Sequence, residues 1–161
     1  VDEAYALKRE GRDSFGQEAV DTLVLEMENR RSELVVIMAG YTREMKEFFL
    51  SNSGLESRFP LVFDFPDYSY PDMAKIFHTM ASAAGLRVHP DVAGQKLIDL
   101  IQDAIPKTVA SKGNARAVRN LLDTVLQRQT DRVAEQGTSS LDALFTLEEV
   151  DFRPPPSGGG G

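Results

Sequence analysis

Two adjacent carboxylates, Asp2 and Glu3, directly follow the apolar residue Val1. An Asp at the end of a buried strand can hold Mg²⁺ beside the phosphates of a nucleotide, and a following Glu can polarise the attacking water. Acidic pairs are also common on solvated turns, and the pair taken alone favours that simpler interpretation. Its chemistry therefore depends on what the rest of the sequence places around it.

Arg58 lies in a loop between a turn and an apolar segment. An arginine in such a loop can reach a phosphate on another subunit, and an arginine finger of this kind raises the rate by on the order of 10³–10⁵. The alternative is a surface arginine paired with Glu56 or Asp64, which stabilises by about 0–1 kcal/mol. Taken alone, Arg58 favours the surface pair.

Arg116 and Arg119 are one helical turn apart, near the start of a predicted helix. The free N–H groups and the dipole at a helix N-terminus attract anions, so an arginine there can report whether a γ-phosphate is present. An ordinary ion pair with Asp123 fits the pattern equally well. His78 and His89 have no partners at metal-ligand spacing, which favours packing or solvent exposure over a metal site.

Composition removes several other classes of function. The absence of cysteine excludes disulfides, thiolate metal sites and a cysteine nucleophile. A net charge of −7 disfavours a nucleic-acid backbone as the main partner, because phosphate contacts need clustered Lys and Arg. No apolar run approaches the roughly 20 residues of a membrane span, and no signal peptide is visible. We expect a soluble intracellular protein, in the cytoplasm or an organelle matrix, without nucleic-acid or membrane partners.

In the first part of the chain, helical and strand-like segments alternate. Residues 17–30 predict an amphipathic helix, and residues 34–39 form an apolar, β-branched run typical of a strand buried on both faces. A short helix over 42–51, with Thr42 as its N-cap, and a short strand over 61–65 follow. This order predicts an α/β layer, the second half of a parallel sheet, over residues 1–66.

Three helical patterns without intervening strands predict an all-helical domain over residues 67–153. They centre on residues 73–80, 97–104 and 118–135, whereas residues 144–152 fit either a strand or a helical turn. Residues 154–161 form a flexible Pro/Gly tail. Because an apolar residue leading straight into two carboxylates resembles the end of a buried strand, we expect the chain to be part of a longer one.

The order of these motifs resembles the second half of an AAA+ ATPase, and more closely the CbbX/CfqX family. That family includes red-type Rubisco activase, and related ATPases occur in type VII secretion and sporulation. The resemblance covers residues 1 to about 132. The segments that carry it are Val1–Leu7 (Walker B), Met27–Arg30 with Leu34–Tyr41 (sensor 1), Ser51–Arg58 (arginine-finger loop), Phe65–Ser69 (start of the lid) and Asn114–Asn120 (sensor 2).

The resemblance implies a role for each matching residue. Asp2 would help to position Mg²⁺, and Glu3 would activate water. Tyr41 stands where many AAA+ proteins place a polar sensor-1 residue, and a tyrosine at this place is usual for the CbbX/CfqX family. Arg58 would act in trans on the nucleotide of a neighbour, and Arg116 would be the sensor-2 arginine of the lid.

The implied function is an ATP- and Mg²⁺-dependent motor that assembles into a homo-oligomeric ring, commonly a hexamer, and remodels a protein client as a chaperone does. A non-catalytic interaction module that kept the lid and lost the nucleotide site is the alternative. A DNA-binding helical domain is disfavoured by the acidic balance, although its third helix carries Arg116, Arg119, Arg128 and Arg132.

The family's phosphate-binding loop, G-x-x-x-x-G-K-[ST], is absent from this sequence, because no glycine directly precedes a lysine. Without that loop nothing cradles the β and γ phosphates. We therefore expect the 161-residue chain alone to bind ATP poorly and to hydrolyse it negligibly. A phosphate-release assay on the purified chain checks this expectation, and clear turnover would contradict it.

Overall fold

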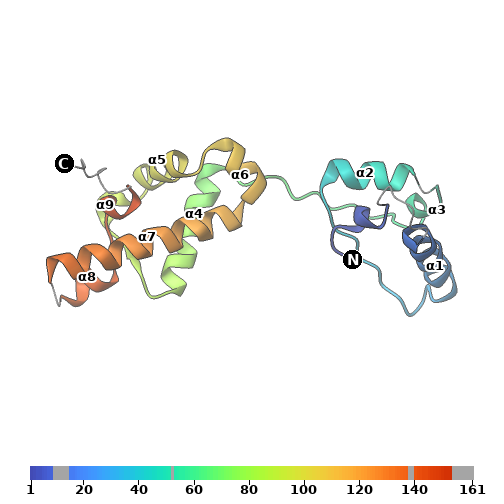
Figure 1. Ribbon diagram of the computed structural model, residues 1–161, viewed down its shortest axis with the longest axis horizontal. Helices are drawn as coiled ribbons and strands as arrows, with labels where there is room; N and C mark the ends of the chain where they lie inside the picture. The colour runs from blue at the N-terminus through green and yellow to red at the C-terminus, as the bar shows by residue number, and fades with distance from the viewer. Residues whose placement is uncertain (9–14, 52, 138–139, 154–161) are drawn as a thin grey trace. The chain divides into compact units, whose positions relative to one another are not determined.

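The computed structural model describes residues 1–8, 15–51, 53–137 and 140–153 (Figure 1). The chain divides into two compact units, Val1–Phe65 and Pro66–Gly161, and each is described by itself. The Pro/Gly tail predicted over residues 154–161 lies outside the described residues.

Unit 1 is a small helical layer around a buried core. Its elements are η1 (Ala4–Lys8), α1 (Phe15–Asn29), α2 (Thr42–Leu50) and α3 (Ser53–Glu56). Ala4, Val20, Phe48 and Leu55 are buried together, one from each element. The helices predicted over 17–30 and 42–51 are confirmed. The predicted cap is wrong, because Tyr41 occupies the N-cap of α2 and Thr42 is already helical.

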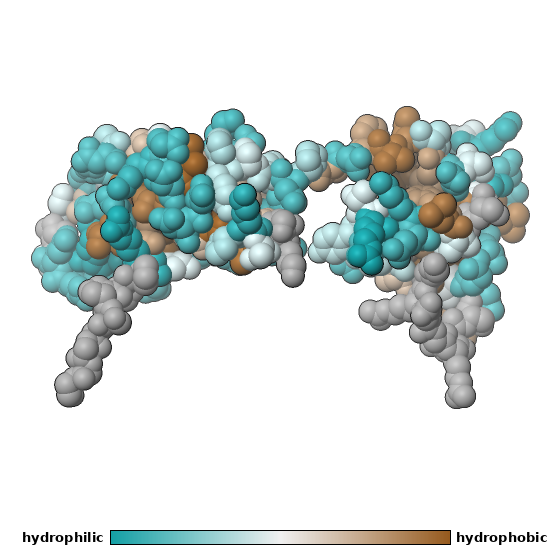
Figure 2. All heavy atoms as spheres, turned by 90° about the horizontal axis from the view of Figure 1, so that it is seen from above, coloured by the Kyte–Doolittle hydropathy of each residue, from teal (hydrophilic) through white to brown (hydrophobic). Residues whose placement is uncertain are grey.

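The two predicted strands of unit 1 are not strands in this structure. Residues 34–39 and 61–65 have no assigned secondary structure. Most of their apolar side chains are exposed, with Val35 at 85% and Phe63 at 76%, whereas Val36 and Met38 are half-buried. A strand buried on both faces needs paired neighbours and a covering layer. Among the described residues, neither segment has both paired neighbours and a covering layer. Their exposed apolar side chains contribute to the hydrophobic surface of this unit, shown in brown in Figure 2.

Unit 2 is helical apart from one short parallel strand pair. Its elements are α4 (Tyr70–Ala83), β1 (Arg87–Val88), η2 (Pro90–Val92), α5 (Gln95–Ala104), α6 (Lys107–Gly113), α7 (Ala115–Gln136), α8 (Leu141–Phe145), β2 (Thr146–Leu147) and α9 (Glu149–Phe152). The three predicted helices are confirmed as α4, α5 and α7, whereas α6 was not predicted. Residues 144–152 contain both alternatives, because β2 pairs with β1 and is followed directly by α9.

The core of unit 2 forms where α4 and α5 pack against α7 (Figure 1). Its fully buried side chains include Met73, Phe77, Ile101, Val118 and Val125. They recur at the three- and four-residue spacing of a helix face, which is why the sequence pattern located these helices correctly.

The first turn of α4 is fixed by its cap. The Ser69 hydroxyl accepts a hydrogen bond from the Asp72 N–H, and Pro71 occupies the first turn, where its missing N–H costs nothing. Hydrogen bonds from Ser69 and then Lys75 hold the pKa of the Asp72 carboxyl below its usual value.

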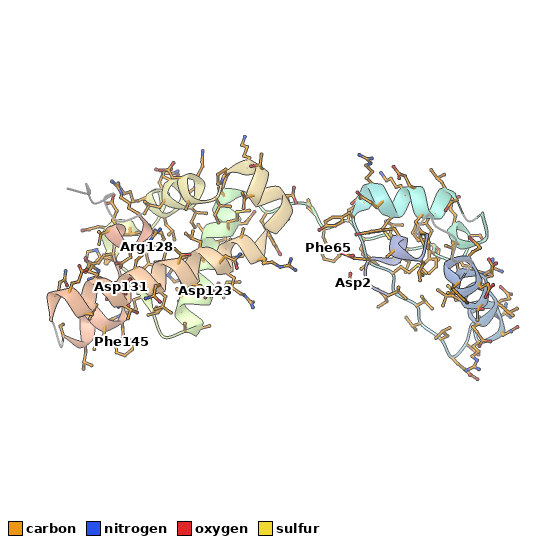
Figure 3. The ribbon with its side chains drawn as sticks, in the orientation of Figure 1. Asp2, Phe65, Asp123, Arg128, Asp131 and Phe145 are labelled. Atoms are coloured by element: carbon orange, nitrogen blue, oxygen red, sulfur yellow. The ribbon has the colours of Figure 1, made fainter. Side chains whose placement is uncertain are left out.

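A buried ion pair fixes the C-terminal segment on α7. The guanidinium of Arg132 makes two hydrogen bonds to Asp151, Nε to Oδ1 at 2.8 Å and Nη2 to Oδ2 at 3.0 Å, and a third to Glu148. Asp151 is 1% exposed, and its hydrogen bonds raise the pKa of Arg132. One turn earlier, Arg128 donates to the Phe152 carbonyl at 3.0 Å, so that it lies beside α9 (Figure 3).

These contacts count against the DNA-binding alternative. That alternative needs four arginines available on one helix, and two of them, Arg128 and Arg132, are turned onto the chain's own C-terminal segment. Guanidinium groups that are partly buried and already paired are less available to a phosphate backbone.

The ion pair generates a stability prediction. Asp151→Ala leaves Arg132 partly buried without its main partner, so it should lower the free energy of unfolding of unit 2 by about 3–5 kcal/mol. Asp142→Ala is the matched control, because Asp142 pairs with Arg87 at an exposed site and should cost at most about 1 kcal/mol. Amide hydrogen exchange at Val118 and Val125 measures both, and equal effects would contradict the assignment.

Candidate functional site

Backbone hydrogen bonds in a parallel pattern place the start of the chain beside residues 37–41. The Val1 nitrogen donates to the Ile37 carbonyl at 2.7 Å. The Ala39 N–H donates to the Val1 carbonyl at 2.9 Å, and the Ala4 N–H donates to the Ala39 carbonyl at 3.1 Å. Because the two segments run in the same direction, their carboxyl ends lie together, as at the ligand-binding edge of parallel sheets.

Asp2, labelled in Figure 3, and the next residue, Glu3, occupy that edge in a turn. Both are exposed, and the Asp2 Oδ1 accepts the Glu3 N–H at 3.0 Å. Glu3 has a φ of 47°, in the left-handed region that non-glycine residues enter at a cost. Strain of this kind is found at functional sites, where the surrounding structure holds it.

Tyr41 is brought to the same edge through an aromatic contact. Its ring stacks on Tyr5 with centroids 6.4 Å apart and planes inclined by 30°. Desolvation raises the pKa of the Tyr5 phenol, and the neighbouring charges of Glu3, Tyr41, Glu44 and Asp2 raise it further. The structure thus gathers three of the predicted site residues, Asp2, Glu3 and Tyr41, around Tyr5, a residue that the sequence did not single out.

Gly40 makes this arrangement possible. A Cβ at Gly40 would lie 2.7 Å from the Tyr5 ring and 2.8 Å from the Met45 sulfur. Real side chains do not approach so closely, so any larger residue would displace one of the two. Gly40 is needed for its lack of a side chain, which lets the Tyr5 ring lie against the backbone.

Arg58 is folded back onto its own unit. Its Nη1 donates to the Gly54 carbonyl at 2.9 Å, and its Nη2 lies 3.4 Å from Glu28. The surface pair expected with Glu56 or Asp64 is wrong, because the partner is Glu28. The Nε is buried without a hydrogen-bond partner among the described residues, which is costly for a charged group and weakens the hold of this conformation.

Arg116 lies in unit 2, on the first turn of α7. It is exposed, and in the described part of the chain neither Arg116 nor Arg119 forms the ion pair expected with Asp123. Beside Arg116 is an open hollow of about 410 Å³. The residues that line it are Thr108, Val109, Gly113, Arg116, Ala117 and Asn120. An exposed arginine at a helix N-terminus next to open space is suited to an anion.

The sequence analysis included Asn114 in the sensor-2 segment but assigned it no role of its own. It makes no side-chain cap on α7 and instead hydrogen-bonds Asp67 and the Tyr68 N–H. The available signal was an asparagine at a helix boundary, since Asn is enriched where φ is positive.

Asp2 offers Mg²⁺ one carboxylate, which is enough only if nucleotide phosphates and water supply the other ligands. Within residues 1–8, 15–51, 53–137 and 140–153 no group of three or more His, Asp or Glu side chains could hold a metal ion. Magnesium usually keeps several waters and takes one or two carboxylates together with substrate phosphates. A single exposed carboxylate such as Asp2 meets that requirement. No helix in the described part of the chain is long and apolar enough to cross a membrane.

Comparison with known proteins identifies relatives for most of the chain. Residues 69–158 match the family described as the AAA lid domain. Stage V sporulation protein K of Bacillus subtilis is 38% identical over 153 residues, covering 94% of this chain and 47% of the relative. Protein CbbX of Cereibacter sphaeroides is 38% identical over 156 residues, covering 95% and 50%. The ESX-3 secretion system protein EccA3 of Mycolicibacterium smegmatis is 39% identical over 167 residues, covering 95% and 27%. The chain thus spans half or less of the length of these relatives.

The packing at Gly40 gives a testable contrast between two glycines of unit 1. Gly40→Ala should lower the free energy of unfolding of this unit by about 1–3 kcal/mol, because Tyr5 or Met45 must move. Gly54→Ala is the control, since a Cβ there meets only ordinary contacts at 3.6 and 3.8 Å and α3 gains up to about 1 kcal/mol of helix propensity. Amide exchange at Val20 and Phe48 separates the two, and an unchanged Gly40→Ala variant would refute the packing argument.

Proposed function

Because the chain belongs to the AAA+ ATPases, we propose that it forms the C-terminal part of a ring-forming motor that couples ATP hydrolysis to remodelling of a protein client. The observation that carries this proposal is the parallel backbone pairing of residues 1–4 with residues 37–39. It supports a nucleotide site at this edge because Asp2, Glu3 and Tyr41 reach it from two neighbouring segments. The proposed site requires a phosphate-binding loop in addition to these residues.

Within the site the two carboxylates have different tasks. Asp2 would help to hold Mg²⁺ beside the nucleotide phosphates, and the bound ion would supply positive charge to the phosphate oxygens. Glu3 accepts a proton from, or orients, the attacking water, which requires an exposed carboxylate in a fixed position. The Asp2–Glu3 turn supports this, because the hydrogen bond of Asp2 to the Glu3 N–H fixes the backbone while leaving the Glu3 carboxylate exposed. Tyr41 borders the same edge at the sensor-1 place, where its exposed ring can contact the nucleotide.

Arg58 acts on the nucleotide of a neighbouring subunit. To do so it must leave Glu28 and the Gly54 carbonyl, and the weak contacts described above support such a release. The distance of 3.4 Å to Glu28 is long for a charged pair. The buried, unpaired Nε gains a partner on leaving. Since a site on one subunit is completed by an arginine from the next, the assembly is head-to-tail and closes into a ring, commonly a hexamer in this class.

Arg116 contacts a phosphate of the nucleotide from the lid. Its exposure, its place on the first turn of a 22-residue helix and its lack of an acidic partner in the described residues support this role. When Arg116 contacts a phosphate, the attraction draws α7 and the lid core with it, because α7 packs against α4, α5 and α9. The proposed client is a protein.

The catalytic assignment predicts a specific pattern of ATPase activity in the full-length gene product. Glu3→Gln should lower kcat by about 10²–10⁴ because the water is no longer activated. Arg58→Ala should lower it by about 10³ or more because the transition-state charge is no longer neutralised. Mixing the two variants should restore part of the activity, since a Glu3→Gln subunit still offers Arg58 to a neighbour that retains Glu3.

Two controls separate catalysis from folding. Arg43→Ala removes an exposed arginine that pairs with Glu47 and should leave kcat unchanged. Glu28→Gln breaks the contact that Arg58 makes within its own unit and should not reproduce the Arg58→Ala defect. If Arg58→Ala is as fast as wild type, or Glu28→Gln is equally slow, the trans role is wrong and a non-catalytic interaction module becomes the better description.

A further inference from the structure

Asn114 adopts a backbone conformation that asparagine rarely tolerates. Its φ is 44° and its ψ is −126°, and among the described non-glycine residues only Glu3 shares a positive φ. This combination of angles is easy for glycine and strained for any residue with a Cβ. The preceding residue is Gly113, so the strained position is held by an asparagine although a glycine is next to it.

The side chain of Asn114 explains what holds the strain. Its Oδ1 accepts the Tyr68 N–H at 2.9 Å, and its Nδ2 donates to the Asp67 Oδ1 at 2.8 Å. Both oxygen and nitrogen of the amide are therefore used, and the bond to the Asp67 carboxylate is charge-assisted. We call these two hydrogen bonds the Asn114 clasp.

The backbone of Asn114 joins two helices at the same point. Its N–H donates to the Ala110 carbonyl at 2.8 Å and ends α6, while its carbonyl accepts the Ala117 N–H at 3.0 Å and begins α7. An asparagine at this position usually caps the following helix with its side chain. Here the clasp directs the side chain elsewhere, so the first N–H groups of α7 keep their attraction for an anion.

The clasped segment lies in unit 2, just after the boundary between the two units. Unit 1 ends at Phe65 and unit 2 begins at Pro66, so Asp67 and Tyr68 follow the boundary directly and lead into the Ser69 cap of α4. Asn114 is two residues before Arg116. One side chain thus ties the start of the arginine-bearing helix to the segment by which the lid is joined to the rest of the chain.

We propose that Asn114 is a positioning residue that couples an anion at Arg116 to the Asp67–Tyr68 segment. The inference rests on the proposed function, because it takes Arg116 as the residue that meets the phosphates. When an anion draws the first turn of α7 toward itself, the Asn114 clasp carries the displacement to the Tyr68 backbone. Without the clasp, Arg116 still binds the anion but the link between the units no longer responds.

Amide NMR of the 161-residue chain tests this with sodium tripolyphosphate as the probe and sodium chloride at equal ionic strength as the control. The tripolyphosphate is titrated to concentrations high enough to offset the weak phosphate binding expected without the phosphate-binding loop. In the wild type, tripolyphosphate should shift the amide signals of both Arg116 and Tyr68. In Asn114→Gly, which removes the clasp and relieves the backbone strain, the Arg116 shift should remain and the Tyr68 shift should be lost. The Tyr68 amide should also exchange with solvent roughly fivefold faster, since it has lost one hydrogen bond.

Exchanging the side chains at positions 67 and 114 should restore the Tyr68 response. Asn114→Asp keeps an acceptor for the Tyr68 N–H but places a second carboxylate against Asp67, so it should weaken the Tyr68 response. Adding Asp67→Asn supplies an amide that donates to the new carboxylate at position 114 and restores both hydrogen bonds. The double variant should regain the Tyr68 response, which a purely structural defect at position 114 would not allow.

The outcomes distinguish the anion site at Arg116 from its coupling to Tyr68. If tripolyphosphate shifts Arg116 but leaves Tyr68 unchanged in the wild type, or if Asn114→Gly responds at Tyr68 as the wild type does, the coupling is overturned and the anion site stands. If Arg116 itself does not respond, the lid role of Arg116 in the proposed function fails, and the coupling fails with it.

Discussion

The parallel backbone pairing between residues 1–4 and 37–39 is the constraint on which the arrangement of unit 1 depends. Three hydrogen bonds fix the direction of both segments, and Asp2, Glu3 and Tyr41 all lie at the carboxyl ends that this direction brings together. The contact of Tyr5 with Gly40 and Tyr41 then fills the space beside the turn. The helices α1 and α2 bury Ala4 from the same segment, so packing and hydrogen bonding enforce one geometry.

Unit 2 is organised around the long helix α7, which carries Arg116 on its first turn. Its apolar core packs against one face of α7, and the Arg132–Asp151 pair with Gln129 and Arg128 attaches the C-terminal segment to the other part of that helix. A helix packed in this way moves as a rigid rod, because close-packed interiors transmit displacement rather than absorb it. Arg116 at one end of the rod is therefore mechanically connected to the whole unit.

Backbone strain marks both candidate regions. The two non-glycine residues with positive φ in the described part of the chain are Glu3 and Asn114, one beside the paired carboxylates and one beside Arg116. Each is held by a nearby side-chain hydrogen bond, from the Glu3 N–H to Asp2 and from Asn114 to Asp67. Strain costs of order 1–3 kcal/mol and persists where the surroundings over-determine it, so its location supports the view that these turns are kept for their geometry.

The sequence by itself determined the longer helices α1, α2, α4, α5 and α7, the order of the motifs and the identity of the charged candidates, because a helix face and a motif are local patterns that periodicity and residue type reveal. It did not determine the state of residues 34–39 and 61–65, since a strand buried on both faces needs both paired neighbours and a covering layer. Only the tertiary structure decided which partners the arginines take: Glu28 for Arg58, Asp151 for Arg132 and none in the described residues for Arg116. It also revealed the Asn114 clasp, which joins residues 46 and 47 positions apart. Contacts of that range depend on how helices pack in three dimensions, and no local pattern encodes them.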